Sequence, residues 1–250
     1  PLTHARIAHS SNWIAGTVTA STTHADYFAD GPDNSMTFEK WQPTALPATW
    51  ELDFGGSNAV EYCAIAAHDM GTQFISLQVQ RYDSGSWTDM IPTTAIGNDM
   101  PIFCLFTETS DTKYRILVSN GSVPTIGVIR FGVALQMERP IYGGHSPLDM
   151  SRMTTMRATR SETGEFLGRT KLRTKFATTF DWNNLTAAWV RTNWRPLQLA
   201  IEAKPFFIAW RPITFSEVGY CQAPQVPIPT NTGTRNLMSV SLDVEALGYD

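Results

Sequence analysis

The 250-residue sequence is poor in cysteine, with only Cys63, Cys104 and Cys221. The odd number and the lack of paired spacing argue against a disulfide framework and a zinc site. Free cysteine behaves as a small apolar residue, so we expect three buried, reduced thiols. Long hydrophobic runs are also missing. No apolar stretch approaches the roughly 18 residues that span a bilayer, and we expect no membrane insertion.

The motifs of the common catalytic classes are absent as well. The five histidines form no His-x-His or His-Glu-x-x-His arrangement, and no Gly-x-Ser-x-Gly elbow or phosphate-binding glycine loop occurs. No pair of carboxylates has a spacing that indicates a glycosidase. We therefore predict that the protein is not an enzyme and needs no cofactor or metal.

A strong positive charge is missing too. The formal net charge is −4, but residues 1–140 carry −7 and residues 141–250 carry +3. Neither half has the excess of lysine and arginine that marks a nucleic-acid footprint, so we expect no nucleic-acid partner. The opposite signs predict that the two halves are electrostatically different objects.

The first residues show no secretory leader. They read Pro1-Leu2-Thr3-His4-Ala5-Arg6, without a basic start and a continuous apolar segment. We expect a protein that is made in the cytoplasm or was processed before this point.

Turn residues and short β-type runs are what the sequence has in abundance. The 17 glycines and 15 prolines indicate many turns. Alternating or continuous apolar runs occur at 49–54, 60–67, 74–82, 113–119 and 125–137. The segment Asp83-Ser84-Gly85-Ser86 is typical of a hairpin turn. Short strands at regular spacing predict a mainly β protein that begins with a jelly-roll β-sandwich.

The second half combines strands with one helical region. Residues 152–160 and 165–180 read as an antiparallel pair, and residues 237–244 read as a strand with one buried face. Asn183 or Asn184 can cap a helix near 184–203, within which Pro196 can start a second piece. We predict a C-terminal antiparallel β domain with one or two short helices.

A Gly- and Pro-rich crossing separates these two regions. Residues 139–147 read Arg-Pro-Ile-Tyr-Gly-Gly-His-Ser-Pro, as a linker would. We predict a first domain over 1–138, a linker over 139–147 and a β-rich assembly domain over 148–250.

Several motifs in residues 10–137 occur in a characteristic order and spacing. They are Val18-Thr19-Ala20-Ser21, Phe28-Ala29-Asp30-Gly31, Ala48-Thr49-Trp50-Glu51-Leu52-Asp53-Phe54-Gly55 and Tyr114-Arg115-Ile116-Leu117-Val118. This region resembles the discoidin-like, galactose-binding-like jelly-roll family. The resemblance implies sugar binding by class only, because the usual bracketing cysteine pair is absent and no ligand triad can be carried over.

In the second half, residues 206–212 and 218–221 carry a further resemblance, to tail and tail-tip proteins of tailed bacteriophages. The similarity rests on residues 206–212, Phe-Phe-Ile-Ala-Trp-Arg-Pro, and on Val218-Gly219-Tyr220-Cys221. It implies a structural virion protein, assembled in the host cytoplasm, whose partners are other virion proteins, copies of itself and a host-surface glycan. The alternatives are a carbohydrate-binding module and an accessory domain of a glycan-active system.

Candidate ligand residues cluster in the loop from His24 to Trp41. Tyr27 and Trp41 offer aromatic faces, and Asp30, Asp33 and Asn34 offer short acceptors, as a shallow sugar site requires. The three acceptors are also possible Ca²⁺ ligands, and a turn whose side chains bond their own backbone is a further interpretation. His68 follows an apolar strand and is a candidate at the mouth of a loop.

Four cations are spaced by two at Arg169, Lys171, Arg173 and Lys175. In a strand they would project from one face, opposite Leu172, Thr174 and Phe176. The first interpretation is an edge strand that uses charge to prevent unwanted pairing. The second is a subunit interface against an acidic neighbour, such as the −7 half of another copy.

Overall fold

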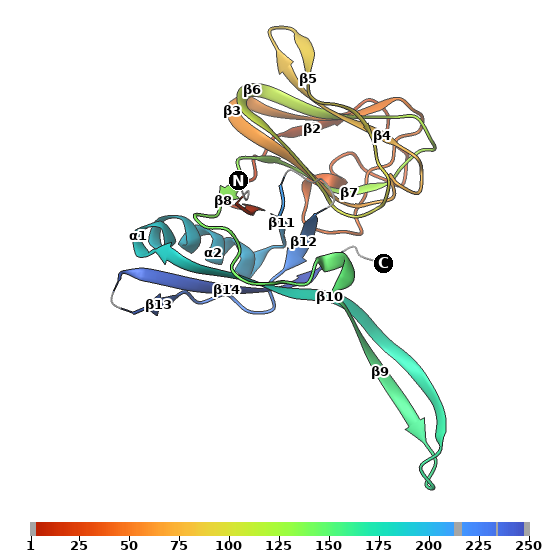
Figure 1. Ribbon diagram of the computed structural model, residues 1–250. Helices are drawn as coiled ribbons and strands as arrows, with labels where there is room; N and C mark the ends of the chain where they lie inside the picture. Colours follow the sequence, from red (N-terminus) through yellow and green to blue (C-terminus); the bar gives the residue numbers. More distant parts are fainter. Residues whose placement is uncertain (1–3, 213–216, 234, 248–250) are drawn as a thin grey trace.

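The computed structural model describes residues 4–212, 217–233 and 235–247 as a mainly β protein with two antiparallel sheets (Figure 1). The predicted fold class is therefore confirmed. The strands are β1 (Arg6–Ala8), β2 (Thr17–Ala20), β3 (Ala48–His68), β4 (Ser76–Asp83), β5 (Ser86–Ala95), β6 (Ile102–Ser119), β7 (Ile126–Gly132), β8 (Leu135–Gln136), β9 (Arg152–Arg160), β10 (Phe166–Thr186), β11 (Phe206–Ala209), β12 (Val218–Gln222), β13 (Thr230–Thr232) and β14 (Leu237–Ala246). The helices are α1 (Ala187–Trp189) and α2 (Arg195–Ala203), joined by a π turn (Val190–Trp194), with 3-10 turns η1 (Gly31–Asp33) and η2 (Leu148–Met150).

The first sheet is a β-sandwich built on two long strands. Its order is β2-β3-β6-β4-β5, and β7 pairs with the second part of β3. The pairing of β3 with β6 shifts its register between Asp53 and Asn58. Such an irregularity lets a strand bend, so that its two parts can lie in different layers. Trp50 and Ile116 from one layer and Ile65 from the other lie in the same buried cluster. Ser84 and Gly85 both have positive φ, so the predicted hairpin turn is confirmed.

The second sheet has the order β8-β1-β11-β12-β14-β10-β9, with β13 added to β14. The helical region packs on it, because Trp194, Leu197 and Ile201 share a buried cluster with strand residues such as Leu242. The predicted helix is confirmed, but its predicted cap is wrong. Thr186 is the N-cap, and its hydroxyl accepts a hydrogen bond from the backbone N–H of Trp189. Asn184 lies before the helix with a φ of 61°.

Strand β1 lies in the second sheet, between β8 and β11, although it comes from the start of the chain. Arg6 of β1 also pairs with Glu61 of β3 at 2.8 Å. A buried cluster joins side chains of both sheets, among them Tyr62, Phe103 and Tyr220. The division into domains at 139–147 stays a prediction.

One hairpin leaves the body of the molecule. Strand β9 and the first part of β10 extend the second sheet beyond the body of the molecule, and we call residues 152–175 the arm (Figure 1). Its strands are joined at Ser161-Glu162-Thr163-Gly164, as the sequence predicts. Beyond the arm, β10 enters the sheet and pairs with β14 from Phe176 onward.

Candidate functional site

The loop between β2 and β3 encloses a cleft. The cleft has a volume of about 750 Å³ and is lined by Asp26, Tyr27, Phe28, Asp30, Gly31, Asp33, Asn34, Phe38, Glu39 and Lys40. Short hydrogen-bonded turns shape it, since Gly31 N–H donates to the carbonyl of Phe28 and Asp33 N–H to that of Asp30. Four of the predicted ligand residues, Tyr27, Asp30, Asp33 and Asn34, therefore line one cavity.

Trp41 does not line the cleft, so its prediction as a stacking residue is wrong. Its side chain is 0% exposed and belongs to the core of the sandwich. Its backbone bridges to Ile126 of β7, and its Nε1 donates to the carbonyl of Thr22 at 3.1 Å. A fully buried indole with a satisfied N–H has no face to offer a ligand.

His68 is also buried and does not face a loop mouth, which corrects its predicted role. The Met70 N–H donates to Nδ1 at 3.3 Å, so Nε2 carries the proton that is donated to the Met100 carbonyl at 2.9 Å. Burial lowers the pKa of the ring to about 4. A neutral imidazole with both nitrogens occupied supports the fold at the end of β3.

Asp33 is held by a buried arginine behind the cleft. Arg130 of β7 is buried, donates a hydrogen bond to the Asp33 carboxylate and lies over the Trp13 ring at 4.5 Å. Burial raises the pKa of the Asp33 carboxyl, and the charge of Arg130 opposes that rise. Asp33 thus fixes the η1 turn against β7 and is the least available of the predicted acceptors.

Asn34 is likewise engaged within the loop. Its Nδ2 donates to Glu39, and its Oδ1 accepts from the Met36 N–H at 2.6 Å. This agrees with the interpretation of a turn whose side chains bond their own backbone. Across the described ranges, no group of three or more His, Cys, Asp or Glu is placed to hold a metal ion. Tyr27 and Asp30 are the predicted residues that remain open to a ligand.

Two aromatic residues of the cleft were missed by the sequence analysis. Phe28 and Phe38 are 67% and 73% exposed, and both line the cavity. No strand or helix period surrounds them, so local pattern gives no sign of burial or exposure. Asp26, Asp30 and Glu39 add carboxylates around the rim, whereas Lys40 is its one lining cation. The cleft therefore combines aromatic faces with an excess of carboxylates.

The cysteines form no reactive centre. Cys63, Cys104 and Cys221 are free and buried, which confirms their prediction. Burial raises the pKa of each thiol, to about 12 for Cys104. Thiols at such pKa values carry almost no thiolate near neutral pH.

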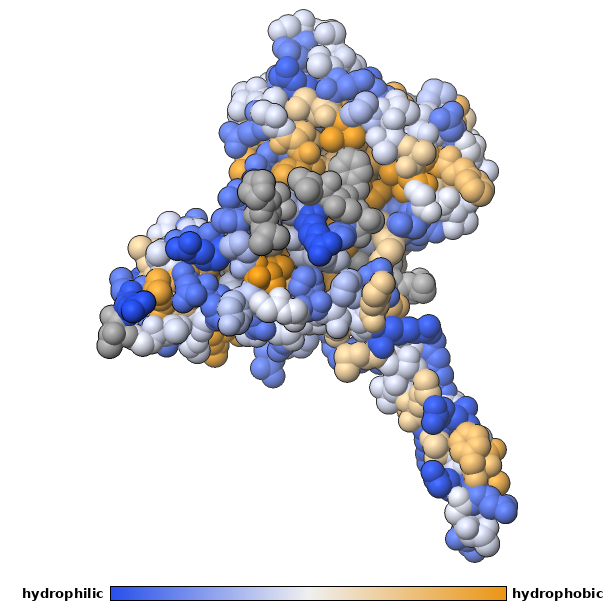
Figure 2. All heavy atoms as spheres, viewed as in Figure 1, coloured by the Kyte–Doolittle hydropathy of each residue, from blue (hydrophilic) through white to orange (hydrophobic). Residues whose placement is uncertain are grey.

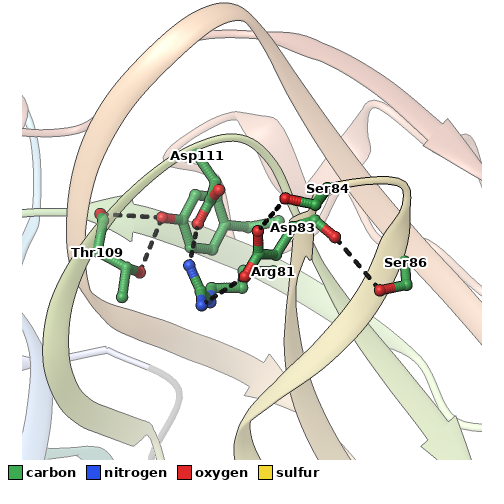
Figure 3. A network of polar contacts seen from close by, with 7 residues as sticks. Arg81, Asp83, Ser84, Ser86, Thr109 and Asp111 are labelled. Atoms are coloured by element: carbon green, nitrogen blue, oxygen red, sulfur yellow. Dashed lines mark hydrogen bonds and ion pairs between the residues drawn. The ribbon is translucent and has the colours of Figure 1, made fainter.

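A second polar cluster ties the β4–β5 hairpin to β6 (Figure 3). Arg81 reaches Asp83 at 2.8 Å and Asp111 at 2.7 Å. The Tyr114 hydroxyl donates to the Thr109 carbonyl at 3.0 Å beside them. Both carboxylates already share one guanidinium, so this cluster is a structural tie between strands.

The four cations of the arm do not form one uninterrupted row. The register shifts between Lys171 and Arg173, which breaks the strict alternation of faces. Arg173 lies 3.6 Å from Glu245 of β14, and Lys175 donates to the same carboxylate. Arg169 and Lys171 lie farther out, where both residues are exposed. Their role at a subunit interface stays a prediction.

Comparison with known proteins gives structural likeness without a family assignment. No family model and no curated protein matches the chain. The family 32 carbohydrate-binding module of C. perfringens NanJ, solved with galactose, is 14% identical with a TM-score of 0.42, over 51% of this chain and 98% of that one. Chitosan-binding module 1 of the Paenibacillus sp. IK-5 chitosanase/glucanase is 17% identical with a TM-score of 0.41, over 48% and 97%.

SpGH29 is a longer similar structure. It is 15% identical with a TM-score of 0.42, and the match covers 50% of this chain but only 28% of SpGH29. The chain thus spans under a third of that protein. None of these similarities assigns a ligand to this chain. In addition, no helix within the part of the chain that the structure describes is long and apolar enough to cross a membrane.

Proposed function

We propose that this protein is a non-catalytic binding protein whose β-sandwich holds a carbohydrate in the cleft between β2 and β3. The observation that carries the proposal is the pairing of exposed Phe28 and Phe38 with Tyr27 and Asp30 around one cavity of about 750 Å³. Aromatic faces suit the apolar face of a sugar ring, and a carboxylate accepts hydrogen bonds from sugar hydroxyls. The discoidin-like resemblance of the sequence points to the same class of ligand.

The charge of the cleft limits the class of sugar that it can bind. Asp26, Asp30 and Glu39 line it against Lys40, and Asp33 is already paired with Arg130. A negative potential repels uronates and sulfated sugars, whereas it attracts amines. The ligand of the proposed site is therefore a neutral or amine-bearing glycan.

A glycan array followed by calorimetry tests this proposal. Phe28→Ala and Phe38→Ala are expected to weaken binding of the best glycan by roughly fivefold each, as loss of an aromatic contact of about 1 kcal/mol implies. Tyr142→Ala is the matched control, because Tyr142 is 63% exposed and lies outside the cleft. Binding that is equally sensitive to Tyr142→Ala, or an array without any hit, would contradict the proposal.

A structural role in assembly is the second candidate, and the exposed arm favours it. The sequence-based hypothesis places this role in a tailed-phage virion, with copies of the chain and other virion proteins as partners. The similar structures reported above include no virion protein. Proteomics of purified particles tests the location, since a virion component must copurify at a fixed ratio to the other structural proteins.

A further inference from the structure

The arm is the part of the molecule that receives the least support from the rest. Within it, β9 pairs with β10, and β10 meets β14 only from Phe176 onward. A two-stranded hairpin is marginally stable by itself in water, because neither face is covered. A surface that covers one face would therefore stabilise an arm of this length.

The side chains of the arm indicate that such a surface is partly apolar. Met153, Met156, Phe166, Leu167 and Leu172 are between 50% and 63% exposed. Figure 2 shows hydrophobic and hydrophilic residues interspersed along the projecting hairpin. Large apolar side chains gathered on an exposed element mark a contact site.

The charge of the arm specifies the sign of its partner. Residues 152–175 contain seven lysines and arginines and two glutamates, so the net charge is +5. Glu245 compensates Arg173 and Lys175 at the base. Arg157, Arg169 and Lys171 have no ion pair within the described residues. The cations also oppose pairing of two arms with each other, so the partner surface is acidic.

The chain itself carries a surface with the complementary combination. Asp26 and Asp30 are exposed at the rim of the cleft, beside Phe28 and Phe38. No lysine or arginine forms an ion pair with either aspartate among the residues that the structure describes. Carboxylates beside aromatic rings match guanidinium and ammonium groups beside methionine and leucine. The arm points away from the β-sandwich of its own chain (Figure 1).

We propose that the arm of one copy docks on the acidic, aromatic rim of the cleft of a second copy. The two surfaces are different patches, so the contact is head to tail and generates a ring or an open chain of subunits. This inference goes beyond the proposed function and does not require a glycan.

Sedimentation velocity of the full chain, without glycan, tests the contact. The experiment compares about 0.1 M and about 1 M salt, between which the Debye length falls from about 10 Å to about 3 Å. We expect self-association at low salt and its weakening at high salt. The double variant Arg169→Glu/Lys171→Glu is expected to raise the dissociation constant by about tenfold or more. These positions are chosen because both side chains are exposed and neither contacts Glu245.

Two further variants make the test specific. Arg191→Glu/Arg195→Glu is the matched control, because it changes the net charge equally at exposed positions of the helical region. It is expected to associate like the wild type. Asp26→Lys/Asp30→Lys is expected to weaken association, and combining it with the arm variant is expected to restore it. Circular dichroism verifies that every variant is folded.

A wild type that is monomeric at all concentrations would overturn the proposal. Equal weakening by the arm variant and its matched control would do the same, since it would show a general charge effect. So would a combined variant that associates no better than either double variant. Glycan binding is measured on the Arg169→Glu/Lys171→Glu variant, whose cleft is intact and is not covered by an arm, so failure of one proposal leaves the other standing.

Discussion

At the scale of single residues, Trp41 shows where local pattern misleads. An aromatic residue beside a polar loop looks like a ligand contact, yet its bridge to Ile126 places it in the core. The burial of Trp41 depends on its pairing with a residue far away in the sequence, so the local hydrophobic pattern does not indicate it. Phe28 and Phe38, which the pattern gave no reason to choose, are aromatic residues of the same loop that face solvent.

The different positions of Trp41 and Phe38 predict effects on stability of very different size. Trp41→Ala is expected to reduce the free energy of unfolding by about 3–5 kcal/mol, because it removes a fully buried indole. Phe38→Ala is expected to change it by less than about 0.5 kcal/mol. Urea unfolding monitored by circular dichroism measures both. A Trp41 variant as stable as the wild type would contradict the buried position.

His68 predicts a dependence of stability on acid. Its pKa is lowered from 6.5 to about 4 by burial, so between these values the unfolded chain binds more protons than the folded one. Stability is full above pH 6.5 and is lost as the pH falls toward 4, by at most about 3 kcal/mol. His9, lowered to about 4 by burial, acts in the same direction.

Urea midpoints measured from pH 7 to pH 4 check this expectation. His68→Gln keeps a donor for the Met100 carbonyl but cannot titrate, so its midpoint is expected to fall less steeply. Parallel curves for the variant and the wild type would show that His68 does not contribute.

Phe74 combines an unusual backbone with an exposed ring. Its φ is 58° and its side chain is 80% exposed. A non-glycine residue in this region costs about 1–2 kcal/mol, and glycine's greater freedom in the unfolded chain returns about 0.5–1 kcal/mol. Phe74→Gly is therefore expected to raise the free energy of unfolding by up to about 1 kcal/mol. Phe74→Ala, which keeps the Cβ, is the control and is expected to give no gain.

At the scale of elements, the sequence predicts where strands occur, but it does not predict which neighbouring runs form one continuous strand. Residues 49–54 and 60–67 were separate runs, and the structure joins them in β3 across Gly55 and Gly56. Glycines are typical of both a turn and a bend in a strand, and only pairing with β6 distinguishes the two. Strand β1 spans three residues, which is too short for a periodic signal.

The start of the helix gives a prediction at this scale. Thr186 accepts from the Trp189 N–H and donates to Glu138 at 2.8 Å. Thr186→Ala is expected to lower the free energy of unfolding by about 1–2 kcal/mol, as loss of an N-cap does. Asn183→Ala is the control and is expected to cost much less, because the helix begins after Thr186. If urea unfolding gave equal losses of stability for Thr186→Ala and Asn183→Ala, the assignment of Thr186 as the N-cap would be contradicted.

At the scale of the whole molecule, the position of β1 predicts a long-range dependence. Ile7 is fully buried and faces Leu135 on one side and Ile208 on the other. Ile7→Ala is expected to lower the free energy of unfolding by about 2–5 kcal/mol. Hydrogen exchange is expected to show the loss of protection in β11, far away in the sequence, and unchanged protection in β4. Loss confined to residues near the N-terminus would contradict this expectation.

The position of β1 also orders events during synthesis. The ribosome releases β1 before its partner β11, which follows about 200 residues later and takes about 10–40 s at ordinary rates of translation. Until β11 emerges, only one edge of β1 can be paired, by β8. The sandwich can form in that interval, since β2 to β7 pair only among themselves. Completion of the second sheet around β1 then waits for strands that are synthesised well after it.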